Sequence, residues 1–69
     1  MTRLKHERRT RKMSQVRLGL DVRIPQPTLS QIERGRLLPT EEQRSSLALF
    51  LGIPPEDLLK EVVVVEVRV

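Results

Sequence analysis

The chain has 69 residues and no cysteine, so it has room for one domain and for neither a disulfide framework nor a thiolate metal site. No apolar run approaches the about 20 residues that cross a bilayer, which predicts a soluble, cytoplasmic protein with no membrane partner. The net charge of +4 is unevenly divided, since residues 1–36 carry +7 and residues 37–69 carry −3. The basic half suits a polyanion, although charge alone does not separate DNA, RNA and an acidic protein.

Glycine and proline divide the sequence into helix-length segments with short connections, which predicts an all-helical bundle. The first helix is expected from about Thr2 to Arg11, with Leu4 as its main apolar anchor. The second helix is expected to begin after Ser14, a favoured N-cap residue, and to continue to about Val22.

The third helix is expected to begin near Pro27, because proline is favoured in the first turn of a helix, and to end at Gly35. Thr40 opens a capping-box pattern for a fourth helix that Gly52 ends, and a short fifth helix is expected to start at Pro55. The apolar residues of these helices are expected to form the core: Leu18, Val22, Ile24, Leu29, Ile32, Leu47, Phe50, Leu51, Leu58 and Leu59.

The last eight residues, 62–69, are a β-branched run typical of a strand. Nothing earlier in the chain resembles a partner strand, so antiparallel pairing with a second copy about a two-fold axis would satisfy its edge. We therefore expect a homodimer, and the alternative is a tail that frays or packs on a helix. Valine occupies every odd position, and these residues are the expected dimer contacts: Val63, Val65, Val67 and Val69.

Two short helices joined by a tight turn, with glycine directly after the second, are typical of a helix-turn-helix, here at residues 14–35. Its residues resemble the Xre/Cro-like family of phage repressors and bacterial regulators. The resemblance is carried by Ser14-Gln15, by the Thr-Leu-Ser-Gln-Ile-Glu-Arg-Gly sequence of residues 28–35 and by the Leu-Gly-Ile corner at 51–53. It covers about residues 4–59 and implies an all-α, five-helix lambda-repressor-like DNA-binding domain over residues 1–61, followed by the β-strand.

The resemblance also implies roles for the polar side chains of the motif. Residues that match base-contacting positions of the third helix are Gln26, Thr28 and Gln31. Residues that match phosphate-contacting positions are Gln15, Arg34 and Arg36. Glutamine can read adenine and threonine can contact the thymine methyl, whereas phosphate contacts position the protein without reading sequence. Glu33 resembles a family glutamate that pairs with an arginine of the first helix, here Arg8.

Four positions depart from the family pattern. Gly19 stands where alanine is usual, at a cost of about 1 kcal/mol in helix propensity. Arg23 holds a turn position often occupied by glycine, so the turn either avoids positive φ or carries strain of about 1 kcal/mol. Pro25 and Pro27 stiffen the entry to the third helix and cannot donate a hydrogen bond to a base.

We expect a sequence-specific double-stranded DNA-binding transcriptional regulator that acts as a repressor, with the third helix, about residues 27–34, in the major groove. No second histidine and no cysteine accompany His6, so we expect no metal, no cofactor and no enzymatic activity. RNA is disfavoured as the ligand because Phe50 is the only aromatic residue. The alternative is an antitoxin that neutralises a protein toxin, with the valine run paired to the sheet edge of the toxin.

Overall fold

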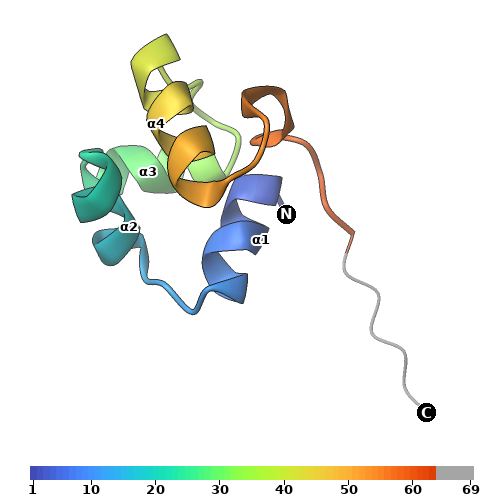
Figure 1. Ribbon diagram of the computed structural model, residues 1–69, viewed down its shortest axis with the longest axis horizontal. Coiled ribbons are helices and arrows are strands. Elements are labelled where there is room, and N and C mark those ends of the chain that lie inside the picture. The colour runs from blue at the N-terminus through green and yellow to red at the C-terminus, as the bar shows by residue number, and fades with distance from the viewer. Residues whose placement is uncertain (64–69) are drawn as a thin grey trace.

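The computed structural model describes residues 1–63 and consists of short helices around one core (Figure 1). The elements are α1 (Arg3–Thr10), α2 (Gln15–Val22), α3 (Gln26–Glu33), α4 (Glu41–Leu51) and the 3-10 turn η1 (Pro55–Asp57). The expected all-helical class is therefore confirmed for these residues. Within them, no helix combines the length and the apolar character that crossing a membrane requires.

Side-chain caps begin three of these helices. The hydroxyl oxygens of Thr2, Ser14 and Thr40 each accept a hydrogen bond from the backbone amide three residues further along. Thr40 and Gln43 complete the capping box that the sequence predicts for α4. α3 has no side-chain cap; it follows Pro25, whose φ of −55° and ψ of 140° lead the chain into the helix.

Residues in the left-handed conformation end α2 and α4 and follow α3. Gly52 ends α4 with a φ of 69°, and Gly35 follows α3 with a φ of 72°. Arg23 ends α2 with a φ of 59° and a ψ of 43°, so the strain left open by the sequence is present in this turn. Glycine would adopt the same conformation without a side-chain clash.

Gly19 allows α2 to approach the turn that follows it. A Cβ atom at this position would lie 2.5 Å from the carbonyl oxygen of Ile24, which is too close for any side chain without a shift of the backbone. The amide of Ile24 also donates a 2.9 Å hydrogen bond to the carbonyl oxygen of Gly19. Glycine in place of the usual alanine therefore permits this close backbone contact.

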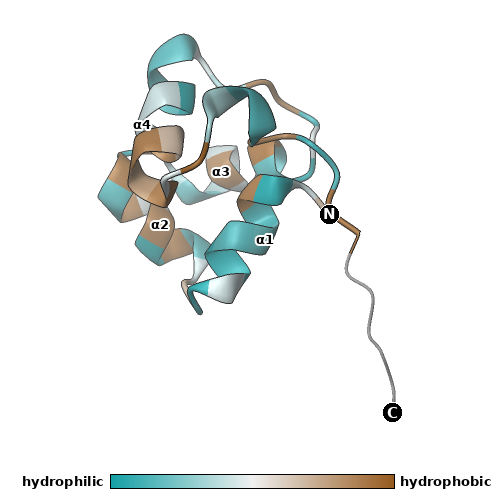
Figure 2. Cartoon of the chain, turned by 45° about the vertical axis from the view of Figure 1, so that its right-hand side comes forward, coloured by the Kyte–Doolittle hydropathy of each residue, from teal (hydrophilic) through white to brown (hydrophobic). Residues whose placement is uncertain are grey.

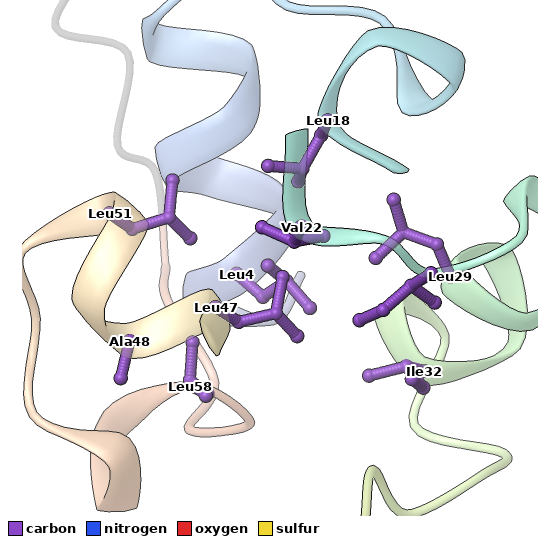
Figure 3. Packing of buried hydrophobic residues seen from close by; sticks show 10 residues of the cluster. Leu4, Leu18, Val22, Leu29, Ile32, Leu47, Ala48, Leu51 and Leu58 are labelled. Atoms are coloured by element: carbon purple, nitrogen blue, oxygen red, sulfur yellow. The ribbon is translucent and has the colours of Figure 1, made fainter. Parts of the chain in front are cut away.

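The core is a cluster of aliphatic side chains from all four helices, the turn after α2 and the residue after η1 (Figure 3). The five residues expected to hold the helix-turn-helix together are buried: Leu18, Val22, Ile24, Leu29 and Ile32. The other buried members are Leu4, Leu47, Ala48, Leu51 and Leu58. The prediction for Phe50 is wrong, because this residue is 43% exposed and Ala48 takes the inward position on α4. Residues 47, 48 and 51 share one helix face, and residue 50 lies beside it.

Charged residues cover most of α1, which is hydrophilic over much of its length (Figure 2). Glu7 accepts hydrogen bonds from Arg11 and Arg3, each at 2.7 Å, and these bonds lower the pKa of its carboxyl group. Because this pKa is lower in the folded chain, the stabilisation is present at neutral pH and is lost as the pH falls through the folded value. Arg11 also donates to the carbonyl oxygen of Leu51 at 2.7 Å, which ties α1 to the end of α4.

The fifth helix is not confirmed as an α-helix, because the segment that starts at Pro55 forms a single 3-10 turn over residues 55–57. The carbonyl oxygens after this turn are used by α1 instead of by a continuing helix. Leu58 accepts a hydrogen bond from the amide of Leu4 at 2.9 Å, and Lys60 accepts one from the amide of Arg3 at 2.8 Å. These amides belong to the first turn of α1, where a helix has no internal partners for its donors.

Residues 60–62 lie beside the start of the chain (Figure 1). The amide of Val62 donates to the carbonyl oxygen of Met1 at 2.7 Å, and Thr2 and Glu61 form an isolated antiparallel bridge. The expectation that the valine run has no partner in the chain is therefore wrong at Val62. The bridge uses backbone atoms, so no β pattern in residues 1–3 signals it. Val62 and Val63 are not assigned to a strand, and the rest of the predicted strand, residues 64–69, lies outside the described residues.

We predict that Arg23→Gly stabilises the protein by about 0.5–1 kcal/mol, because it relieves a strain of about 1–2 kcal/mol at a smaller cost in backbone entropy. Urea unfolding followed by circular dichroism measures the change. Arg23→Ala is the matched control, since it removes the same charge and keeps the left-handed strain. A glycine variant no more stable than the alanine variant would show that the turn is unstrained.

Candidate nucleic-acid interface

α2 and α3 are joined by the short turn of residues 23–25 and share one side of the core. Leu18 and Val22 of α2 and Leu29 of α3 are buried together there (Figure 3). This arrangement of two short helices around a tight turn is that of a helix-turn-helix. It leaves the outward face of α3 available for contact.

A buried ion pair connects α1 to the end of α3. Two guanidinium nitrogens of Arg8 donate to the two carboxylate oxygens of Glu33, Nε at 2.6 Å and Nη2 at 3.0 Å. The Glu33 side chain is 1% exposed and that of Arg8 is 10% exposed. The third nitrogen of Arg8, Nη1, donates to the carbonyl oxygen of Met13 at 2.7 Å. The pairing expected from the sequence is thus confirmed, and it also fixes the turn between α1 and α2.

Two glutamines extend this network to the start of α3. Gln15 donates from Nε2 to Oε1 of Glu33 at 3.1 Å, and it accepts a 2.8 Å hydrogen bond from Nε2 of Gln26. Both ends of α3 are therefore tied to α2 through one side chain, Gln15. The Gln26 amide keeps its oxygen and a second N–H, which are the groups a glutamine needs to read an adenine.

The expected base-contacting residues occupy different parts of α3. Gln31 is exposed on the face opposite to Leu29 and Ile32, whereas Thr28 is half-buried at the border of that face. Gln26 is exposed at the first position of the helix, beside α2. The three residues therefore follow α3 from its start to its outward surface. Of the three side chains, that of Gln31 is exposed on the face away from the core.

The expected phosphate-contacting residues flank the same helix. Arg34 and Arg36 are exposed directly after α3, on either side of Gly35. The ion pairs formed by residues 1–63 use other arginines, so the charges of these two face solvent. The amide of Arg36 donates to the carbonyl oxygen of Gln31 at 3.0 Å, which fixes the chain where it leaves the helix. Gln15 is half-buried and carries the bonds described above.

Thr2 belongs to the same network, although its place in the sequence predicts only the start of the first helix. Its Oγ1 donates a hydrogen bond to the main-chain carbonyl oxygen of Glu33 at 2.9 Å. A threonine ahead of a helix signals an N-cap, but nothing in the sequence indicates a contact with a residue 31 positions away. Among residues 1–63, no three acidic, histidine or cysteine side chains are placed to hold a metal ion.

The fold, the tight turn and the exposed face of α3 define a helix-turn-helix DNA-binding domain. A family model described as helix-turn-helix matches residues 4–58, which is most of the chain. The chain therefore belongs to the Xre/Cro-like helix-turn-helix family, whose members are DNA-binding regulatory domains and not enzymes. None of the curated proteins matches it.

We predict that Glu33→Ala destabilises the protein by about 3–5 kcal/mol, because it leaves the Arg8 guanidinium buried without its partner. Thermal unfolding followed by circular dichroism measures the loss. Asp21→Ala is the control, since Asp21 pairs with Arg17 at 3.4 Å on the surface and such pairs contribute about 0–1 kcal/mol. Equal losses of stability for the two variants would show that the buried pair contributes no more than the surface pair.

Proposed function

We propose that the protein is a sequence-specific transcriptional repressor that places α3 in the major groove of double-stranded DNA. The observation that carries this proposal is the position of Gln31, exposed on α3 opposite to the residues that fix the helix to the core. An α-helix fits the major groove, where each base pair presents a distinct pattern of donors and acceptors.

In this proposal three side chains of α3 read bases. The Gln31 amide would hydrogen-bond to the N6 and N7 atoms of an adenine, and the Thr28 methyl group would contact a thymine. Gln26 would read a base near the start of the helix while its hydrogen bond to Gln15 holds its direction. Fixing the reader in this way lowers the entropy that it loses on binding.

The flanking residues would bind the DNA backbone. Gln15 would donate to a phosphate oxygen beside the start of α2, and Arg34 and Arg36 would contact phosphates beyond the end of α3. The charge of +7 on residues 1–36 suits this role, because each neutralised phosphate releases counterions. These contacts set the position of the protein on DNA, whereas the contacts with bases set its preference for one sequence.

We predict that Gln31→Ala and Thr28→Ala each weaken binding to the preferred duplex by about 1–3 kcal/mol and change binding to random DNA little. Arg36→Ala should weaken binding to both duplexes alike and lower the slope of log K against log salt by about 1. Fluorescence anisotropy titrations at several salt concentrations separate these outcomes. A Gln31→Ala variant with equal losses on every sequence would exclude α3 as the reading element.

We further propose that residues 1–61 form the DNA-binding domain and that residues 62–69 pair two copies. Val63 is 79% exposed and Val65, Val67 and Val69 lie outside the described residues. The amide of Val62 donates to the carbonyl oxygen of Met1, so the first residue of the valine run is held on the domain. A dimer would present two α3 helices to successive major grooves about 34 Å apart, on a site with two-fold symmetry.

We predict that deletion of residues 63–69 makes the protein monomeric and weakens binding to a symmetric site. The truncation keeps Val62 and its hydrogen bond to Met1, so the domain retains its described contacts. Multi-angle light scattering gives the oligomeric state of both chains. A truncated protein that stays dimeric would contradict the role of the valines, and a full-length chain that is monomeric alone would favour the antitoxin alternative.

A further inference from the structure

Thr2 lies at the point where the start of the chain, the segment after η1 and α3 meet. Its side chain and backbone are buried, with 7% of the residue exposed. Its backbone forms the antiparallel bridge with Glu61, and the neighbouring hydrogen bonds from Arg3 to Lys60 and from Val62 to Met1 hold this bridge on both sides. The position of Thr2 is therefore fixed by the main chain, independently of its side chain.

The Thr2 hydroxyl makes two hydrogen bonds with different directions. Its oxygen accepts a hydrogen bond from the amide of Lys5 at 3.3 Å, and this bond caps α1. Its O–H group donates a hydrogen bond to the carbonyl oxygen of Glu33 at 2.9 Å. A hydroxyl has one donor and two acceptor positions, so both bonds form together. The carbonyls in the last turn of a helix have no partners inside that helix, and Thr2 supplies one to the last residue of α3.

Glu33 is consequently held by three separate elements. Arg8 of α1 and Gln15 of α2 bind its carboxylate, and Thr2 binds its main-chain carbonyl. The two carboxylate contacts hold α3 through the side chain of Glu33. The contact from Thr2 acts on the backbone itself, so it restrains the end of α3 directly.

We propose that Thr2 is a positioning residue for α3, which sets the angle at which that helix meets the bases. The inference rests on the proposed function and adds to it a residue that touches no DNA. Base reading depends on the alignment of side-chain donors and acceptors with fixed base edges, whereas contacts to the phosphate backbone carry no sequence information. Loss of the Thr2 hydroxyl therefore lowers the preference for one sequence more than it lowers binding in general.

The test compares the wild-type chain with four variants on two duplexes. One duplex is selected from a random pool by the wild-type chain, and the other is a scrambled duplex of equal length. Thr2→Val removes the hydroxyl and keeps the branched shape, whereas Thr2→Ser keeps the hydroxyl. Thr2→Asp retains an acceptor that caps α1, but its ionised carboxylate has no proton for Glu33.

Thr40→Val is the matched control. Thr40 caps α4 through its hydroxyl, as Thr2 caps α1, and its described side-chain bond goes to Gln43 within its own helix. This variant therefore loses a helix cap by the same substitution without touching α3. Melting temperatures give the stability of each variant, and anisotropy titrations well below those temperatures give the ratio of the two dissociation constants.

We expect Thr2→Val and Thr2→Asp to lower the ratio of selective to non-selective binding about tenfold, which corresponds to about 1.4 kcal/mol. Thr2→Ser should stay within about twofold of the wild-type ratio, and Thr40→Val should melt at a lower temperature with its ratio unchanged. The proposal is overturned if Thr2→Val and Thr2→Asp keep the wild-type ratio. It is also overturned if Thr40→Val lowers that ratio as much as the two Thr2 variants do. A wild-type chain that selects no sequence would instead contradict the proposed function.

Discussion

The buried carboxylate of Glu33 is the constraint on which the arrangement of the helices depends. A charge that is 1% exposed must be neutralised and hydrogen-bonded inside the protein, because leaving it unpaired costs several kcal/mol. Its partners come from separate elements, Arg8 of α1 and Gln15 of α2, so the requirement can be met only when these helices and α3 take one relative position. The pair thus serves to select a geometry, whatever its net contribution to stability.

This geometry separates the polar residues of the helix-turn-helix into an inner and an outer set. The inner set, centred on Glu33, holds α3 at both ends, and the outer set includes Gln31 and the arginines that follow the helix. A recognition surface that is fixed before DNA arrives loses less entropy on binding.

Local signals allowed most of the fold to be predicted, and non-local contacts account for the errors. Ser14, Thr40 and Gly52 act within one or two turns of their helices, so their roles are visible in the sequence. The bond from the Thr2 hydroxyl to the Glu33 carbonyl and the main-chain pairing of residues 1–3 with 60–62 join distant segments at backbone acceptors, which no pattern of side chains in the sequence indicates. Phe50 was misplaced because the helix period does not decide which border position of α4 turns inward.

Chemical protection of a selected DNA site shows whether α3 reads bases in the major groove. Dimethyl sulfate methylates guanine at N7 in the major groove and adenine at N3 in the minor groove. After selection from a random pool at fixed salt, we expect protection of the guanine N7 atoms that lie within the two patches covered by α3, about 34 Å apart, with adenine N3 still reactive between them. Protection confined to adenine N3, or a pool without any enriched sequence, would contradict base reading by α3 in the major groove.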